Sequence, residues 1–153
     1  MNTDSGPGLI ELLTQLHKGL YKRTSEEVLG IRMRQYLALC KVRDHVGISQ
    51  QELAEMMLLD SNAVVLLLNE LEGLGFLMRR RDPEDRRRHI VELAPQGREQ
   101  LRLAWSRLDD VEDELLSALT AADRETLYKL LSRAVDVSVP TPESAFDLPE
   151  CPG

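Results

Sequence analysis

The chain has 153 residues, 42% of them hydrophobic and 29% charged, which fits one compact domain with extensions and excludes general disorder. No run approaches 18 apolar residues and residues 1–8 form no apolar signal core, so we expect a cytoplasmic protein with no membrane partner. Cys40 and Cys151 lie far apart in the sequence. That spacing is typical of neither a disulfide framework nor a metal site, and it suits a reducing compartment.

The net charge of −7 is unevenly distributed along the chain. Residues 109–150 carry eleven acids and three bases, whereas residues 1–108 carry 15 acids and 16 bases. Residues 79–89 alone contain six arginines. Because phosphate binding responds to the field within a Debye length of ~8 Å, the acidic total does not exclude a nucleic-acid partner.

Apolar residues at helical spacing predict a first helix over residues 9–23 and a second over residues 31–46, separated by Gly30. The apolar positions of the second helix include Met33, Leu37, Cys40 and Val46, and Gly47 ends it. These two segments precede the part of the sequence that carries a recognisable motif.

Residues 49–74 predict a helix-turn-helix. Ser49 to Glu52 form a capping box that begins a helix ending near Met57, and Asp60 can cap a helix that ends near Leu74. We expect the second helix to face the core with residues spaced three and four apart, namely Val64, Leu67, Leu68 and Leu71.

Two predicted strands follow, over residues 76–81 and 89–93, with turn residues 82–85 between them. A long helix is predicted over residues 95–119, and Thr120 with Asp123 can cap a last helix that reaches Val137. Residues 138–153 contain four prolines and are predicted to be a disordered tail, and residues 1–8 a flexible N-terminus.

The segment from Arg81 to Arg88 resembles the wing of the multiple-antibiotic-resistance regulator (MarR) family. That family's pattern is Asp-x-Arg, then alternating apolar strand residues, then a glycine in the following helix; it is matched here by Asp85, Arg87, Val91, Leu93 and Gly97. The resemblance extends over residues 9–137. It implies a mainly α fold with a small β wing, in which residues 31–94 form a winged helix-turn-helix DNA-binding domain. It also implies that residues 9–30 and 95–137 form an intertwined helical dimerisation region.

A physical argument that does not depend on the resemblance also indicates that the wing binds DNA. A guanidinium is weakly hydrated and always charged, so arginines on a tight hairpin enter a narrow minor groove readily. The resemblance implies that Arg87 reaches into that groove and that Asp85 orients it. The alternative is a solvated run of charges. The full set of expected DNA contacts is Ser49, Gln50, Gln51, Ser61, Asn62, Ala63, Val65, Leu66, Arg79, Arg86, Arg87 and Arg88.

Two parts of this expected interface leave alternatives open. Residues 49–51 can bind phosphate at a helix N-terminus, or Ser49 can simply cap that helix. Family members often carry Thr and Arg in the second helix, where this chain has Ala63, Val65 and Leu66. Either Val65 and Leu66 contact thymine methyl groups, or one of them packs under the wing.

The terminal helices carry more apolar surface than a domain of this size needs, which favours a homodimer over intramolecular packing alone. The resemblance also implies an effector, a small aromatic or phenolic ligand, in a cleft involving His17, Tyr21, Tyr36 and Cys40. Residues 9–23 contain no cysteine, unlike the first helix of the family's peroxide sensors, and Cys40 is expected to be an inert core residue.

These observations predict a sequence-specific regulator of transcription, a repressor that binds double-stranded DNA at an inverted repeat. The sequence contains no phosphate loop, nucleophile elbow or metal motif, so we expect neither an enzyme nor a cofactor. The alternative is a winged-helix module that binds protein, suggested by the apolar run at residues 63–66.

Overall fold

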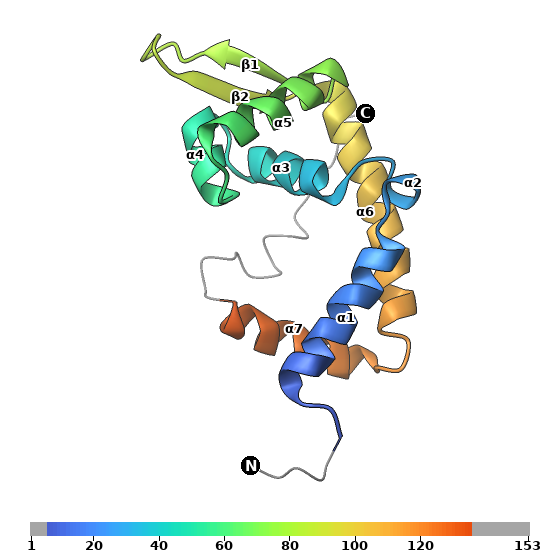
Figure 1. Ribbon diagram of the computed structural model, residues 1–153. Coiled ribbons are helices and arrows are strands. Elements are labelled where there is room, and N and C mark those ends of the chain that lie inside the picture. The colour runs from blue at the N-terminus through green and yellow to red at the C-terminus, as the bar shows by residue number, and fades with distance from the viewer. Residues whose placement is uncertain (1–5, 136–153) are drawn as a thin grey trace. The chain divides into compact units, whose positions relative to one another are not determined.

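The computed structural model describes residues 6–135, and Figure 1 shows the order of its elements. The helices and strands, in chain order, are α1 (Leu9–Arg23), α2 (Glu26–Leu29), α3 (Met33–Asp44), α4 (Gln50–Met56), α5 (Ser61–Gly73), β1 (Leu77–Arg81), β2 (His89–Leu93), α6 (Pro95–Leu115) and α7 (Ala121–Ala134). The mainly α fold with a small β wing is therefore confirmed. The predicted tail over residues 138–153, and Cys151 with it, lies outside the described residues, as does most of the predicted flexible N-terminus.

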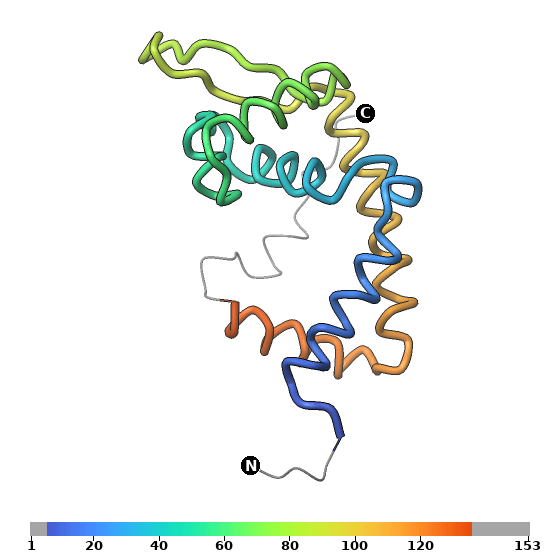
Figure 2. The backbone as a smooth tube through the Cα atoms, viewed as in Figure 1, coloured from blue at the N-terminus to red at the C-terminus, as the bar shows by residue number. Residues whose placement is uncertain are grey.

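The chain divides into two compact units, one ending at Leu115 and the other beginning at Leu116. The first unit contains the helix-turn-helix, whose core is built as the sequence predicts. The four apolar residues of α5 at spacings of three and four, Val64, Leu67, Leu68 and Leu71, are all buried. They share one cluster with Leu39 of α3, Leu53 of α4 and Val91 of β2, and Figure 2 shows these helices and the hairpin gathered together.

The turn between α4 and α5 is set by hydrogen bonds at both of its ends. The Leu59 N–H donates to the Ala54 carbonyl oxygen at 2.8 Å, and Leu58 takes a left-handed conformation with φ of 53°. At the start of α5, an oxygen of Asp60 accepts from the Ala63 N–H at 2.8 Å, as predicted. Helices often end with a glycine in this left-handed conformation, because the conformation strains any residue that has a Cβ atom.

The wing is a two-stranded antiparallel hairpin that contacts the residues before α4 on one side and α6 on the other. Leu77 pairs with Leu93 and Arg81 with His89. The Val91 N–H donates to the Ile48 carbonyl oxygen at 2.8 Å, which fixes β2 against the residues just before α4. On the other side α6 packs tightly, since a Cβ atom on Gly97 would lie 1.9 Å from the Phe76 carbonyl oxygen. The glycine of the family pattern therefore allows α6 to approach the hairpin backbone.

Three features of the helices differ from the sequence prediction. The short helix α2 was not predicted. The second helix is shorter than predicted, and two of the apolar positions that indicated it are exposed: Leu37 to 47%, and Val46, which lies beyond the end of α3, to 94%. Its buried residues are Gln35, Ala38, Leu39 and Val42, and Gln35 is accommodated because its side-chain oxygen accepts from the Arg32 N–H at 3.1 Å.

The long helix α6 ends at Leu115 instead of residue 119, because a turn follows before Thr120. In the second unit, Thr120 and Asp123 form the predicted capping box of α7. Neither α7 nor α1 contains a buried residue. Within residues 6–135, no helix is long and apolar enough to cross a lipid bilayer.

Candidate nucleic-acid interface

The N-terminus of α4 is a fully formed cap. The Ser49 N–H donates to an oxygen of Glu52 at 2.8 Å, and the Ser49 Oγ accepts from the Glu52 N–H at 3.1 Å. The hydroxyl and the N–H of Ser49 hold the pKa of Glu52 below its usual value of 4.5. Ser49 is itself buried, so the side chains that this helix end presents outward are those of Gln50 and Gln51.

A groove of about 430 Å³ lies between this helix end and the wing. Its lining contains five of the expected DNA-contacting residues, and the whole set is Ser49, Gln50, Gln51, Glu52, Glu55, Arg87, Arg88 and His89. An ion pair of 3.3 Å between Arg88 and Glu52 joins the two sides. The groove thus combines two guanidinium groups with the carboxylates of Glu52 and Glu55, and Arg88 is already paired with Glu52. The Arg87 guanidinium is the group of this lining that is best placed to attract a phosphate.

The tip of the wing is a turn that Asp85 shapes. An oxygen of its side chain accepts from the Arg87 N–H at 3.0 Å, and its backbone carbonyl accepts from the Arg88 N–H at 2.9 Å. Within the described part of the chain, the guanidinium groups of Arg86 and Arg87 have no hydrogen-bond or ion-pair partner and are exposed. They are therefore available to an anionic ligand.

Arg79, another expected DNA contact, is bound to α5 in this structure. Its guanidinium donates to Glu72 at 3.0 and 2.5 Å and to the Asn69 side-chain oxygen at 2.6 Å. These bonds, together with the Arg79 charge, lower the pKa of Glu72. Contact between Arg79 and DNA stays a prediction; what the geometry provides is a tie between β1 and α5.

The outer face of α5 is polar at its start and apolar one turn later. Ser61 and Asn62 are exposed at the N-terminus of the helix, and Ala63 is half-buried. Val65 packs against the core cluster, whereas Leu66 is 64% exposed. Packing therefore accounts for Val65 but not for Leu66.

The four residues expected to contact an effector form two pairs, each within one helix. His17 and Tyr21 lie on the exposed side of α1, with ring centroids 6.4 Å apart. Tyr36 and Cys40 lie on α3 and contact each other, and burial raises the pKa of both side chains. A raised pKa keeps the Cys40 thiol protonated and poorly reactive, as expected of a core cysteine.

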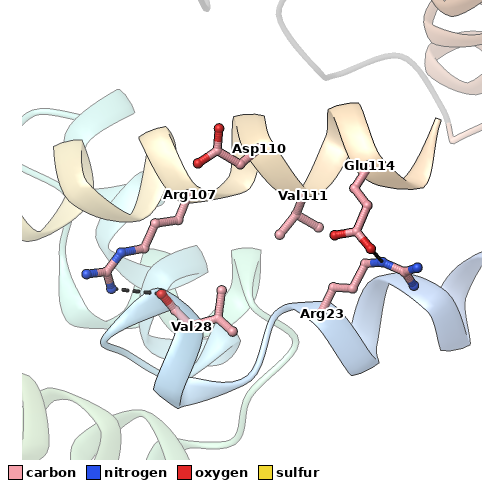
Figure 3. A pocket seen from close by; sticks show the side chains of 6 residues that line it. All are labelled: Arg23, Val28, Arg107, Asp110, Val111 and Glu114. Carbon is pink, nitrogen blue, oxygen red and sulfur yellow. Dashed lines mark hydrogen bonds and ion pairs between the residues drawn. The ribbon is translucent and has the colours of Figure 1, made fainter. Parts of the chain in front are cut away.

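A second cavity, of about 300 Å³, lies among α1, α2 and α6 (Figure 3). Its lining residues are Arg23, Val28, Arg107, Asp110, Val111 and Glu114, and none of the four expected effector residues is among them. Arg23 forms an ion pair of 3.1 Å with Glu114, and Arg107 donates to the Val28 carbonyl oxygen at 2.7 Å. The sequence analysis missed this cavity because its walls lie up to 91 residues apart in the chain.

Comparison with known proteins identifies the family. The model of the MarR family matches residues 31–89, which include the helix-turn-helix and the wing. A transcriptional regulatory protein for the hcr operon of Thauera aromatica is 30% identical over 122 residues, which are 80% of this chain and 74% of that protein. The chain belongs to the MarR family. It is thus a transcriptional regulator of a winged helix-turn-helix fold and not a member of an enzyme family.

Two further comparisons extend the likeness of this MarR-family regulator. The HTH-type regulator YdgJ of Bacillus subtilis is 37% identical over 86 residues, 56% of this chain and only 52% of that protein. The alignment thus spans about half the length of that relative. The solved structure of the transcriptional repressor CouR bound to a 23-mer DNA duplex has a TM-score of 0.75 and 26% identity, and covers 84% of this chain and 93% of that one.

Proposed function

We propose that the protein is a repressor that binds an inverted-repeat operator as a homodimer. The main observation behind this proposal is the groove between the N-terminus of α4 and the wing. Gln50 and Gln51 line it on the helix side, and Arg87 and Arg88 line it on the wing side. The N-terminus of α5, the second helix of the motif, is exposed and can enter the major groove. The similar fold of a repressor on a DNA duplex supports the same assignment.

The direct test is a mobility shift with a labelled duplex from the region upstream of the protein's own gene, in competition with unlabelled random DNA. Retarded duplex that only the specific competitor displaces is the expected result. Binding that random DNA abolishes equally well would contradict sequence-specific reading.

The homodimer is supported by apolar side chains that the single chain leaves exposed. In α1, Leu9 is 71% and Ile10 76% exposed, and in α7 Leu130 is 54% exposed. Exposed apolar side chains on each of these helices suit contacts with a second subunit. Sedimentation equilibrium at micromolar concentration should give twice the chain mass, and a folded monomer would refute the dimer. Two such subunits on one face of DNA require half-sites about 10 bp apart.

We also propose that a small aromatic or phenolic ligand releases the protein from DNA. The aromatic surroundings of Tyr36 and Cys40 support this proposal. The guanidinium carbon of Arg43 lies 5.4 Å from the centroid of the Trp105 ring, and Trp105 contacts both Tyr36 and Cys40. Because Trp105 is the only tryptophan of the chain, its fluorescence reports on this region alone. Titration with a panel of aromatic acids and phenols should change that fluorescence and release the operator at the same concentrations. A ligand that releases DNA without changing the fluorescence would place the site elsewhere.

The alternative function, protein binding through residues 63–66, has less structural support than DNA binding. Val64 is buried and Val65 packs against the core, so only Leu66 of this apolar run is exposed for a partner. A single leucine is too small a surface for a stable protein interface, which typically needs about 800 Å² on each partner.

A further inference from the structure

The outer face of α5 carries one apolar side chain that packing within the subunit does not explain. Leu66 is 64% exposed, while Val64, Leu67 and Leu68 around it in the sequence are at most 4% exposed. The helix therefore buries its core-facing leucines and turns this one in the opposite direction. Under the proposed function this leucine stands in the middle of the helix that enters the major groove, where it would face base edges.

The neighbours of Leu66 on this face are polar. At helical spacing, Asn62 lies one turn before Leu66 and Asn69 one turn after it. The side-chain oxygen of Asn69 is occupied by the Arg79 guanidinium at 2.6 Å, and Glu70 is bound by Arg32 at 2.5 Å. Leu66 is consequently the central side chain of the face, with an asparagine on either side.

Only one base presents an apolar group in the major groove. Thymine carries a 5-methyl group there, whereas the other bases present hydrogen-bond donors and acceptors at their edges, which a leucine cannot satisfy. A leucine placed against guanine or adenine would leave those groups desolvated and unpaired. A leucine placed against thymine instead buries a methyl group.

We propose that Leu66 is a specificity-determining residue that contacts the 5-methyl group of one thymine in each operator half-site. This inference rests on the proposed function, because it requires α5 to lie in the major groove. It goes beyond that function by stating which base the centre of the helix selects. Operator half-sites should therefore contain a fixed thymine at the position opposite the middle of α5.

The probes for the test are duplexes that the wild-type protein itself selects from a randomised DNA library. Each thymine of a selected half-site is then replaced by deoxyuridine, which removes the methyl group and keeps the base pair. Loss of one buried methyl group corresponds to about a fourfold loss of affinity for each half-site. We expect the loss at one thymine position only.

Two variants assign that loss to the leucine. Leu66→Ala should bind the thymine and deoxyuridine duplexes equally, because it no longer reaches the methyl group. Leu74→Ala is the control, since Leu74 is the C-cap residue of the same helix and is 47% exposed, and it should keep the fourfold difference. Circular dichroism melting should show both variants folded, because neither side chain belongs to the buried core.

Failure of the Leu66 role and failure of the proposed function give different results in these experiments. Selection of an inverted repeat in which no thymine is sensitive to deoxyuridine would refute the role of Leu66 and leave the proposed function standing. An undiminished thymine preference in Leu66→Ala would also refute it, since another residue would then read the methyl group. Failure to enrich any sequence would refute the proposed function and the inference together.

Discussion

Asp85 shows how one acid can support a basic binding surface. Its carboxylate accepts from the Arg87 N–H at 3.0 Å and so shapes the turn that presents the arginine. The family resemblance implies that this acid orients the arginine, and the structure shows the carboxylate bound to the Arg87 backbone. A role through the turn and a role through charge predict opposite effects of removing the acid.

Substitution of Asp85 by alanine and by asparagine separates the two roles. Asp85→Ala loses the acceptor and should weaken operator binding, whereas Asp85→Asn keeps a side-chain oxygen in place and should bind nearly as wild type. On charge alone, both variants would gain affinity, because both remove an acid from a basic surface. Fluorescence anisotropy with an operator duplex measures the sign, and tighter binding by Asp85→Ala would exclude the turn-shaping role.

Leu58 has a left-handed backbone conformation, which is unfavourable for a leucine. It is 93% exposed and has φ of 53°, so its side chain gains little from burial while its backbone is strained. Leu58→Gly should raise the free energy of unfolding by about 1 kcal/mol, the usual difference at a left-handed helix C-terminus. Urea denaturation checks this. A loss of stability would show that the exposed leucine makes contacts that outweigh the strain.

At the scale of elements, the α4 cap makes stability depend on pH. The Glu52 pKa is lowered from 4.5 by its hydrogen bonds to Ser49, so the ionised carboxylate stabilises the folded state. That contribution is fully present above pH 4.5 and disappears as the pH falls through the lowered pKa of the folded protein. Wild type should therefore be more stable than Glu52→Gln at neutral pH, by about 0.5 kcal/mol. The two should converge in acid.

The control for this comparison is Glu55→Gln, which removes a carboxylate from the same helix but not from its cap. The Glu55 carboxylate accepts from the Gln51 amide at 3.2 Å. Urea midpoints measured across the acid range should show a pH-dependent gap for Glu52→Gln that is larger than the gap for Glu55→Gln. An equal dependence in both variants would mean that the cap has no special part in it.

The same elements show what a sequence can and cannot predict. The caps at Ser49, Asp60 and Thr120 are local motifs, and each is confirmed because its bonds join residues three apart. The buried face of α5 followed from helical spacing, since Val64, Leu67, Leu68 and Leu71 lie three and four residues apart. In α3 the helix was predicted, but tertiary contacts bury the polar Gln35 and leave Leu37 exposed, which spacing alone does not indicate.

Contacts between residues that lie far apart in the chain could not be predicted from the sequence. The basic run at residues 79–89 indicated the wing, but not that the Arg79 guanidinium would bind Glu72 and Asn69 while that of Arg87 has no partner within residues 6–135. Which arginine is occupied depends on the fold of the hairpin against α5. The cavity between α1 and α6 was missed for the same reason. A residue list from sequence alone thus overstates the set of free cations on the DNA-binding face.

At the scale of the whole molecule, a protein with a net charge of −7 is proposed to bind a polyanion. This is consistent because the acids of residues 109–150 are separated in sequence from the arginines of the wing, and salt screens charges beyond about 8 Å. Operator affinity should fall with added salt, with a slope in log K against log salt of roughly −0.9 for each phosphate neutralised.

The measurement that tests the account most directly compares operator binding by wild type, Arg87→Ala and Arg34→Ala in one anisotropy experiment. Arg34→Ala removes the same charge from an exposed position on α3, away from the groove. Arg87→Ala should weaken binding by about 1–3 kcal/mol per subunit and reduce the salt slope by about 1 for each subunit. Arg34→Ala should bind as wild type. Unchanged binding by Arg87→Ala, or equal losses in both variants, would contradict the assignment of the wing and the α4 N-terminus as the DNA-binding face.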